Sequence, residues 1–117
     1  MEVRTKISIV NDCGEPFMGP GLLKLLRQIE QHKSINKAAK EMHLSYVKAL
    51  NMLNRLEGLL GDSLLIRTRG GKNRGGTELT PLGKRYVREY DKMEKNIRRK
   101  ADKEFEMFTK RLEKCAS

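Results

Sequence analysis

The feature that most constrains this sequence is one long apolar pattern in its C-terminal third. Apolar side chains recur every three or four residues, which is the spacing of one helix face. They are Leu82, Tyr86, Tyr90, Met93, Ile97, Ala101, Phe105, Phe108, Leu112 and Cys115. Thr80 followed by Pro81 is typical of an N-cap and a first helical turn. The pattern therefore predicts a helix over residues 81–115, about 52 Å long at 1.5 Å per residue.

A helix of this length carries a longer apolar face than one small domain can cover. The most economical partner for the surplus is the same helix of a second copy, so the pattern predicts a two-fold dimer. The predicted dimer contacts are Leu82, Tyr86, Tyr90, Met93, Ile97, Phe105, Phe108 and Leu112. The alternative is that the first half of the helix packs on its own domain and about the last 15 residues fray.

The N-terminal third predicts a strand, a loop and a helix in that order. Apolar and polar residues alternate from Val3 to Ile9, which is typical of a half-buried strand. The glycines and prolines of residues 11–21 predict a loop, with Phe17 folded back on the core. Leucines at helical spacing over residues 22–29 predict a first helix that ends near His32.

The middle of the chain predicts a helix-turn-helix. Ser34 is a candidate N-cap for a short second helix, in which Ala38 and Ala39 allow a close helix crossing. Ser45 is a second candidate N-cap, for a third helix over residues 46–60. The apolar face of that helix is Ala49, Leu50, Leu53, Leu56 and Leu60. Two helices joined by a turn of this length are what a helix-turn-helix requires.

The remaining face of the third helix carries polar side chains suited to nucleic acid. They are Ser45, Tyr46, Lys48, Asn51 and Arg55. Asn and Lys can read base edges in the major groove, whereas Ser and Tyr can hold phosphates. Ser34, at the start of the second helix, is a further candidate contact. The alternative is a helix face that is merely solvated.

A basic, glycine-rich segment follows the third helix. Apolar residues 64–66 and the later Leu79 flank it, which predicts two short strands around an exposed tip. The candidate contacts to phosphates or to a minor groove are Arg67, Arg69, Lys72 and Arg74. A surface hairpin without a role is the alternative. A phosphate-binding nucleotide loop is disfavoured, because the required glycine spacing and a Ser or Thr after Lys72 are missing.

Charge favours a polyanionic partner. The 117 residues carry a net charge of +10, and residues 64–100 alone hold twelve basic and four acidic side chains, a net +8. Nucleic acid is favoured over a membrane because no apolar insertion face accompanies the charge. No apolar run approaches the roughly 20 residues that span a bilayer, and no signal peptide is recognisable, so we expect a cytoplasmic protein. The two cysteines and two histidines lack metal-ligand or catalytic spacing, so we expect no enzyme, cofactor or metal.

Residues 19–90 resemble the winged helix-turn-helix of the molybdate-dependent regulator (ModE) family, which is itself similar to the LysR-type DNA-binding domain. The resemblance rests on short motifs spread over this region. They are Ala38-Ala39-Lys40, Ser45-Tyr46, Gly70-Gly71-Lys72, Gly75-Gly76, and Leu79-Thr80 with Gly83. The preceding segment, Gly14 to Gly21, also resembles the stand-alone members of that family. The resemblance implies a DNA-binding regulator of transcription.

The sequence departs from that family in three ways. Lys33 stands where the family usually has Gly, and Val47 and Leu50 stand where it usually has Arg and Trp. An Arg at position 47 would supply a phosphate or base contact, so the operator need not be the family's, and Lys48 is expected to take part of that role. Full-length members carry C-terminal oxyanion-binding domains. The residues after 90 predict only a charged helix, so we expect no molybdate-binding domain in this chain.

The sequence thus predicts a mainly α protein with a small β-hairpin. Residues 1–79 are expected to form a winged helix-turn-helix with an N-terminal strand, and residues 80–117 a long dimerisation helix. The predicted function is that of a homodimeric transcription regulator that binds double-stranded DNA, with the third helix in the major groove. Two other functions stay open, a sequence-neutral nucleic-acid binder and a protein-interaction adaptor.

Overall fold

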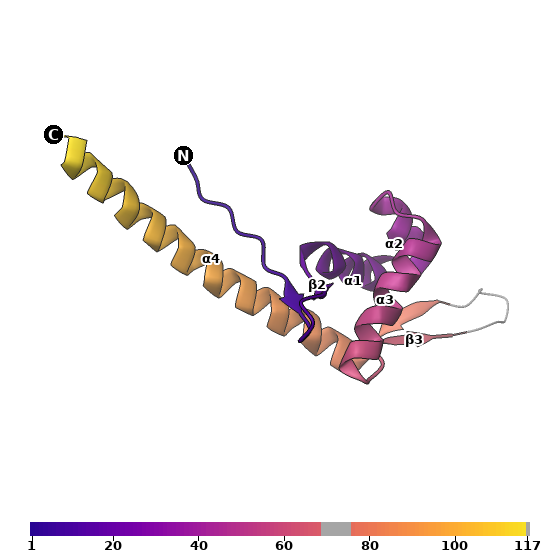
Figure 1. Ribbon diagram of the computed structural model, residues 1–117. Helices are drawn as coiled ribbons and strands as arrows, with labels where there is room; N and C mark the ends of the chain where they lie inside the picture. The colour runs from indigo at the N-terminus through magenta and orange to yellow at the C-terminus, as the bar shows by residue number, and fades with distance from the viewer. Residues whose placement is uncertain (69–75, 117) are drawn as a thin grey trace.

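The computed structural model describes residues 1–68 and 76–116, and it is mainly helical. The elements are, in order, β1 (Ile9–Val10), β2 (Pro16–Met18), α1 (Pro20–His32), α2 (Ile35–Glu41), α3 (Tyr46–Leu60), β3 (Leu65–Arg67), β4 (Thr77–Leu79) and α4 (Pro81–Ala116). The molecule measures 72 × 30 × 25 Å, because α4 extends far beyond the other elements (Figure 1). The predicted fold class, with its β3–β4 hairpin and long C-terminal helix, is confirmed.

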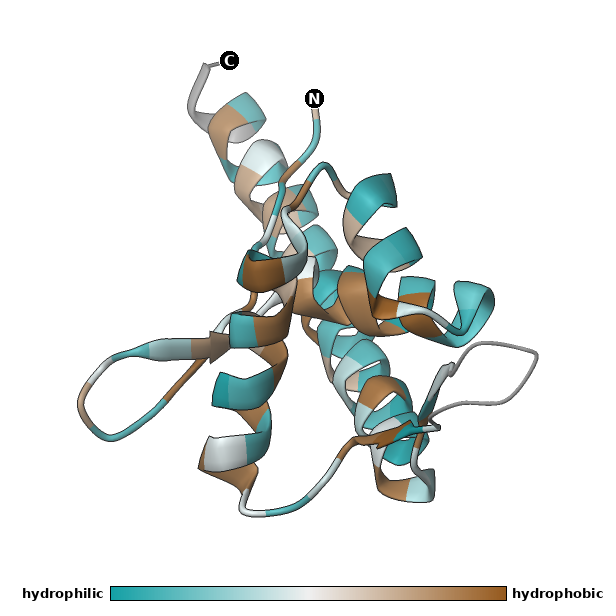
Figure 2. Cartoon of the chain, turned by 90° about the vertical axis from the view of Figure 1, so that its right-hand side faces the viewer, coloured by the Kyte–Doolittle hydropathy of each residue, from teal (hydrophilic) through white to brown (hydrophobic). Residues whose placement is uncertain are grey.

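The core lies where α1, α2 and α3 meet. Leu25, Leu26 and Ile29 of α1 have no exposed surface, and Leu53 and Leu56 of α3 are just as deeply buried. In Figure 2 the hydrophobic segments gather where the helices cross, and hydrophilic segments lie toward the outside. Burial of each such side chain contributes about 1.5–3 kcal/mol to folding. The helical spacing of the leucines therefore accounts for how these three helices assemble.

The helix ends follow local signals in the sequence. The Ser34 Oγ accepts a hydrogen bond from the Lys37 backbone N–H at 3.2 Å, and the Ser45 Oγ accepts one from the Lys48 N–H at 3.1 Å. Both serines are thus the N-caps that the sequence predicted. Gly61 ends α3 in the left-handed conformation, with φ at 71°. The last buried residue of α3 is Leu56, so the final turn lies beyond the core.

Leu60 is therefore a correction to the predicted apolar face of α3. It is 38% exposed, because the face runs one turn further than the core that covers it. Leu50, another residue of the predicted apolar face, is only partly buried against the core. The face that packs inside the domain consists of Ala49, Leu53 and Leu56.

The N-terminal segment differs most from its prediction. Of the expected strand, only its last residue, Ile9, pairs, and together with Val10 it forms β1, which pairs antiparallel with β2 inside the region predicted as a loop. The ladder is short because Pro16 has no N–H to donate and the register shifts beside it. Residues 1–8 stay extended and alternate between half-buried and exposed, as the sequence pattern predicted. Phe17 is partly buried and packs on the core.

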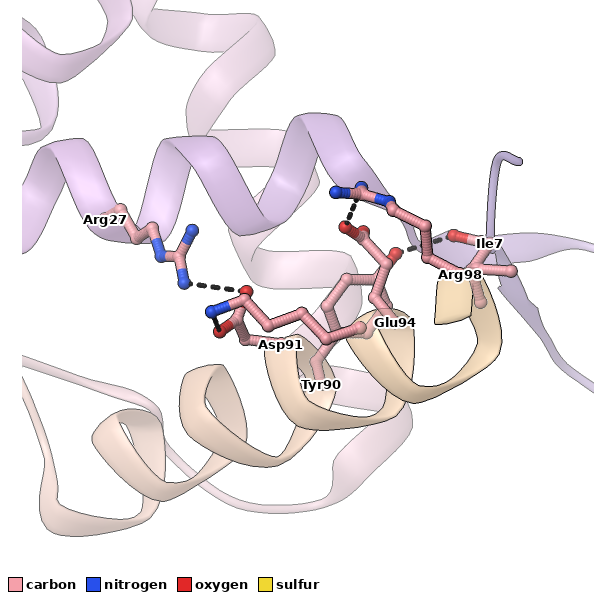
Figure 3. Close-up of polar contacts among 7 residues, drawn as sticks. Ile7, Arg27, Tyr90, Asp91, Glu94 and Arg98 are labelled. Carbon is pink, nitrogen blue, oxygen red and sulfur yellow. Dashed lines mark hydrogen bonds and ion pairs between the residues drawn. The ribbon is translucent and has the colours of Figure 1, made fainter. Parts of the chain in front are cut away.

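The first turns of α4 belong to the core of the domain. Val87 and Tyr90 are buried in the same cluster as the α1 and α3 leucines. The Tyr90 hydroxyl donates a hydrogen bond of 2.6 Å to the backbone oxygen of Ile7, which fastens the N-terminal segment to α4 (Figure 3). Gly83 packs so closely on the chain before β3 that a Cβ there would lie 2.4 Å from the Leu64 carbonyl oxygen.

An ion-pair cluster also joins α4 to α1. The Asp91 carboxylate lies 3.0 Å from the guanidinium of Arg27 and 3.0 Å from the ammonium of Lys95 (Figure 3). The hydrogen bond from Lys95, with that from Arg27, holds the pKa of Asp91 below its ordinary value. Burial raises the pKa of Tyr90, one residue earlier.

The predicted dimer contacts of α4 form an apolar stripe along the helix, of which one part is covered by the chain's own domain and the other part is exposed. Tyr90 is only 3% exposed within its own chain, so it has almost no surface left for a second copy. Tyr86 and Met93 are partly buried on the same core. The exposed members of the stripe are Leu82, Ile97, Phe108 and Leu112. The first half of α4 thus packs on its own domain, as in the alternative, while the helix continues to Ala116.

Candidate nucleic-acid interface

The candidate interface is built on the pair of helices α2 and α3. Ala38, Ala39 and Ala49 are completely buried where these helices cross, and their small side chains allow the close approach. The connecting turn is closed by a hydrogen bond of 2.9 Å from the Leu44 N–H to the Ala39 carbonyl oxygen. His43 in this turn has φ at 57°, the left-handed conformation that ends many helices. The turn fixes α3 relative to α2, so the outer face of α3 is presented rigidly.

The outer face of α3 brings together four of the five side chains that the sequence selected. They are Ser45, Lys48, Asn51 and Arg55, all exposed, whereas Tyr46 is exposed on another side of the helix. A shallow depression of about 330 Å³ lies on it, and its lining is Ser45, Val47, Lys48, Asn51, Met52 and Arg55. Among its lining residues, Ser45 contributes a hydroxyl, Asn51 an amide, Lys48 an ammonium and Arg55 a guanidinium, between the apolar side chains of Val47 and Met52. Such a surface offers hydrogen-bond donors and acceptors to a base edge or a phosphate.

Arg55 is not a free cation, which the sequence did not reveal. Its guanidinium Nη2 lies 2.8 Å from Oε2 of Glu15, in the turn between β1 and β2. The two residues are 40 positions apart, so no local pattern could have paired them. Glu15 is thus an additional residue at this surface, and it was absent from the candidates that the sequence suggested.

Ser34 lies at the opposite end of α2 from α3 and is half-buried as the cap of that helix. Lys33 before it has φ at 56°, which explains why a Gly is usual at this place in the resembled family. The Lys33 carbonyl oxygen accepts a hydrogen bond of 2.9 Å from the Thr77 N–H of β4. This bond ties the base of the β3–β4 hairpin to the helix-turn-helix.

The β3–β4 hairpin forms the base of the predicted wing. Its register pairs Leu65 with Leu79 and Arg67 with Thr77. Leu65, Leu79 and Thr77 are buried, whereas the Arg67 side chain is exposed. The other predicted wing contacts lie outside the described residues. They are Arg69, Lys72 and Arg74.

Two other kinds of site are not found in the part of the chain that the structure describes. Residues 1–68 and 76–113 contain no group of three or more His, Cys, Asp or Glu side chains that could hold a metal ion. No helix within the described ranges is long and apolar enough to cross a membrane.

Comparison with curated proteins points to one family of regulators. The Haemophilus influenzae transcriptional regulator ModE is 40% identical over 79 residues, which are 68% of this chain and 31% of that protein. The Azotobacter vinelandii molybdenum transport protein ModE is 37% identical over 89 residues, which are 76% of this chain and 33% of that protein. The chain therefore spans about a third of the length of these relatives.

The fold is also that of solved structures of LysR-type domains. The crystal structure of the CbnR_DBD–DNA complex superposes with a TM-score of 0.58 at 26% identity, over 74% of this chain and 93% of that one. The resemblance that the motifs predicted is thus confirmed in sequence and in fold. Residues 21–84 match the family of bacterial regulatory helix-turn-helix proteins described as lysR, and the chain belongs to that family.

Proposed function

We propose that the protein is a sequence-specific DNA-binding transcription regulator that acts as a homodimer. The observation that carries this proposal is the rigid, exposed N-terminal face of α3, with Lys48 and Asn51 side by side on a helix-turn-helix. Membership in a family of regulatory helix-turn-helix proteins supports it. The likeness to a domain solved as a DNA complex supports duplex DNA as the partner.

In this proposal the first turns of α3 enter the major groove. Asn51 is suited to a bidentate contact with an adenine and Lys48 to a contact with a guanine. Ser45 and Tyr46, at the helix start, hold phosphates, and so does Ser34 at the start of α2. The Ser45 hydroxyl is used as an acceptor in the helix cap, so its own O–H is available to donate to a phosphate oxygen.

The hairpin would act as a wing on the flanking backbone or minor groove. Arg67, at the exposed end of β3, is the contact that the structure supports. The proposal extends, on sequence alone, to Arg69, Lys72 and Arg74. Arginines in such a position add affinity for any duplex, because phosphate contacts carry no sequence information.

The dimer would form through α4. Phe108 and Leu112 are each 53% exposed on the part of the helix that projects from the domain, and Phe105 stacks on Phe108 with ring centroids 6.3 Å apart. Each large apolar side chain buried by a partner contributes up to about 1.5–3 kcal/mol. A dimer would set two recognition helices about 34–36 Å apart, or a multiple of that distance, on a two-fold symmetric site.

The test of sequence specificity is selection from a pool of random duplexes at near-physiological salt, followed by sequencing of the retained DNA. The proposal expects an inverted repeat. Asn51→Ala and Lys48→Ala should then relax the preference, whereas Arg67→Ala should weaken binding to all sequences alike. Retention without an enriched motif would favour a sequence-neutral binder instead, and identical behaviour of the three variants would contradict the division of roles.

The test of the dimer is sedimentation of the chain alone. The wild type should sediment as a dimer, and the variant with both Phe108→Asp and Leu112→Asp as a monomer. Lys103→Asp, an exposed change on the same helix, is the matched control and should leave the dimer intact. A wild-type monomer that associates only with another protein would contradict the proposed dimer and favour the adaptor function.

A further inference from the structure

The turn between β1 and β2 places a carboxylate against the recognition helix. Glu15 Oε2 lies 2.8 Å from Arg55 Nη2, and the two side chains are 59% and 48% exposed. Arg55 follows Asn51 by four residues, so it lies on the same face of α3 as the proposed base-reading residues. Lys48 is the other cation among the residues that line the depression on this face. Glu15 thus neutralises one of two positive charges there.

The turn that presents Glu15 is held by several hydrogen bonds. The Asn11 side-chain oxygen accepts from the backbone N–H groups of Cys13 and Glu15, each at 2.9 Å. The Asn11 N–H also donates to the Glu15 carbonyl oxygen at 2.9 Å, and Gly14 supplies the left-handed residue, with φ at 82°. Met18, in the strand that follows, is buried in the core. These hydrogen bonds hold the Glu15 backbone in place, so the carboxylate is positioned to contact Arg55 on α3.

We propose that Glu15 sets the sequence-neutral part of the affinity for DNA, because it keeps Arg55 from contacting backbone phosphates. This inference rests on the proposed function as a DNA-binding regulator. An unpaired Arg beside a helix in the major groove would neutralise a backbone phosphate on any duplex. That contact would raise nonspecific affinity without adding discrimination. With its charge compensated by Glu15, Arg55 adds little to the affinity for any duplex, so the protein dissociates more readily from DNA that Lys48 and Asn51 do not recognise.

The exposure of the pair makes this arrangement sensitive to a single substitution. Because both partners are well solvated, the ion pair is weak, and its loss is expected to leave the fold intact. Glu15→Gln keeps the side-chain shape but removes the charge, so Arg55 becomes available to a phosphate. Each additional phosphate neutralised steepens the log–log dependence of affinity on salt by about 0.9. Between 50 and 200 mM salt this corresponds to an additional loss of about 3.5-fold.

The experiment compares wild type, Glu15→Gln and Glu104→Gln on two duplexes, the selected site and an unrelated sequence. Glu104 pairs with Lys100 on α4 at 3.1 Å and is also half exposed, so its variant is the matched control for a unit change in net charge. Glu15→Gln should bind the unrelated duplex several-fold more tightly at 50 mM salt, with a slope steeper by about 0.9. The selected site should gain affinity by the same factor, so the ratio of specific to nonspecific affinity should stay unchanged, and Glu104→Gln should match the wild type.

The same measurements in an Arg55→Ala background test whether Arg55 is responsible. There, Glu15→Gln should change neither the slope nor the affinity at 50 mM salt beyond what Glu104→Gln does. Equal effects of the two glutamate variants, or an effect of Glu15→Gln that persists without Arg55, would overturn the inference. If no variant binds either duplex, the proposed function itself fails. If wild type and Glu15→Gln both bind DNA with the same dependence on salt, the role of Glu15 is refuted while the proposed function stands.

Discussion

Replacement of Gly83 by alanine tests how closely the first turn of α4 packs on the rest of the domain. Gly83 lies in the first turn of α4, where alanine would ordinarily be favoured by about 1 kcal/mol over glycine. The Cβ of an alanine would meet the Leu64 carbonyl oxygen at 2.4 Å and the Leu79 Cβ at 3.3 Å. The Leu64 carbonyl cannot simply move aside, because it accepts a hydrogen bond of 2.9 Å from the Thr80 N–H. Leu64 itself is only 1% exposed.

The expected magnitude follows from these opposing terms. Overpacking of this kind costs about 1–3 kcal/mol, and weakening of the Thr80 hydrogen bond adds about 1 kcal/mol. The helix propensity of alanine offsets about 1 kcal/mol of this. The free energy of unfolding should therefore fall by about 1–3 kcal/mol, and the melting temperature by about 4–12 °C.

Thermal and urea unfolding, followed by circular dichroism, would measure this effect. Gly58→Ala is the matched control, because Gly58 lies inside α3 and an added Cβ there meets nothing within 4 Å. That variant should gain about 0.5–1 kcal/mol of stability. The opposite signs of the two changes are the core of the prediction. A Gly83→Ala protein as stable as the wild type would refute the close packing of α4 on the Leu64 segment.

Three further predictions concern backbone strain, the N-terminal segment and pH. Lys33 and His43 both adopt the left-handed conformation, which glycine adopts without strain. Lys33→Gly and His43→Gly should therefore each raise the free energy of unfolding by about 0.5–1 kcal/mol in urea titrations. A loss of stability would contradict the positive φ. Tyr90→Phe removes the hydrogen bond to Ile7, so amide exchange and proteolysis of residues 1–8 should accelerate, and unchanged rates would contradict that anchor. The lowered pKa of Asp91 stabilises the fold above its unfolded value of about 3.9, and this stabilisation is lost as pH falls through the folded value. Asp91→Asn should therefore unfold with a shallower dependence on pH below 4, and an unchanged acid profile would count against the cluster.

The elements that sequence reasoning placed correctly are those with local chemical signals. The caps of α2 and α3 depend on Ser34 and Ser45, each of which bonds to an N–H three residues ahead. The crossing of α2 and α3 depends on paired alanines, and the stop of α3 depends on Gly61. In each case the residue that carries the signal also makes the contact. Neighbouring positions are therefore sufficient to predict the helix-turn-helix.

What the sequence did not reveal depends on contacts between distant residues. The pairing of Glu15 with Arg55 joins a turn and a helix, and the Tyr90 hydroxyl meets Ile7 across 83 positions. The apolar period of α4 was visible in the sequence. Period alone, however, cannot separate a residue covered by its own domain, such as Tyr90, from one that is left exposed, such as Phe108. Only the fold decides where the domain ends along that helix.

The basic charge of residues 64–100 also divides into two parts that lie at different places in the chain. Of the twelve basic residues in 64–100, four lie between positions 67 and 74 of the sequence and eight lie on α4. Three of those eight, Lys95, Arg98 and Lys100, pair with acidic residues four positions away on the same helix. Such exposed pairs compensate charge locally and weaken the field that a distant phosphate experiences. Much of the net +8 is therefore the solvated surface of a long helix. DNA affinity in the proposed function would depend on the smaller number of cations near α3 and the wing, so a single acidic residue such as Glu15 can change that affinity.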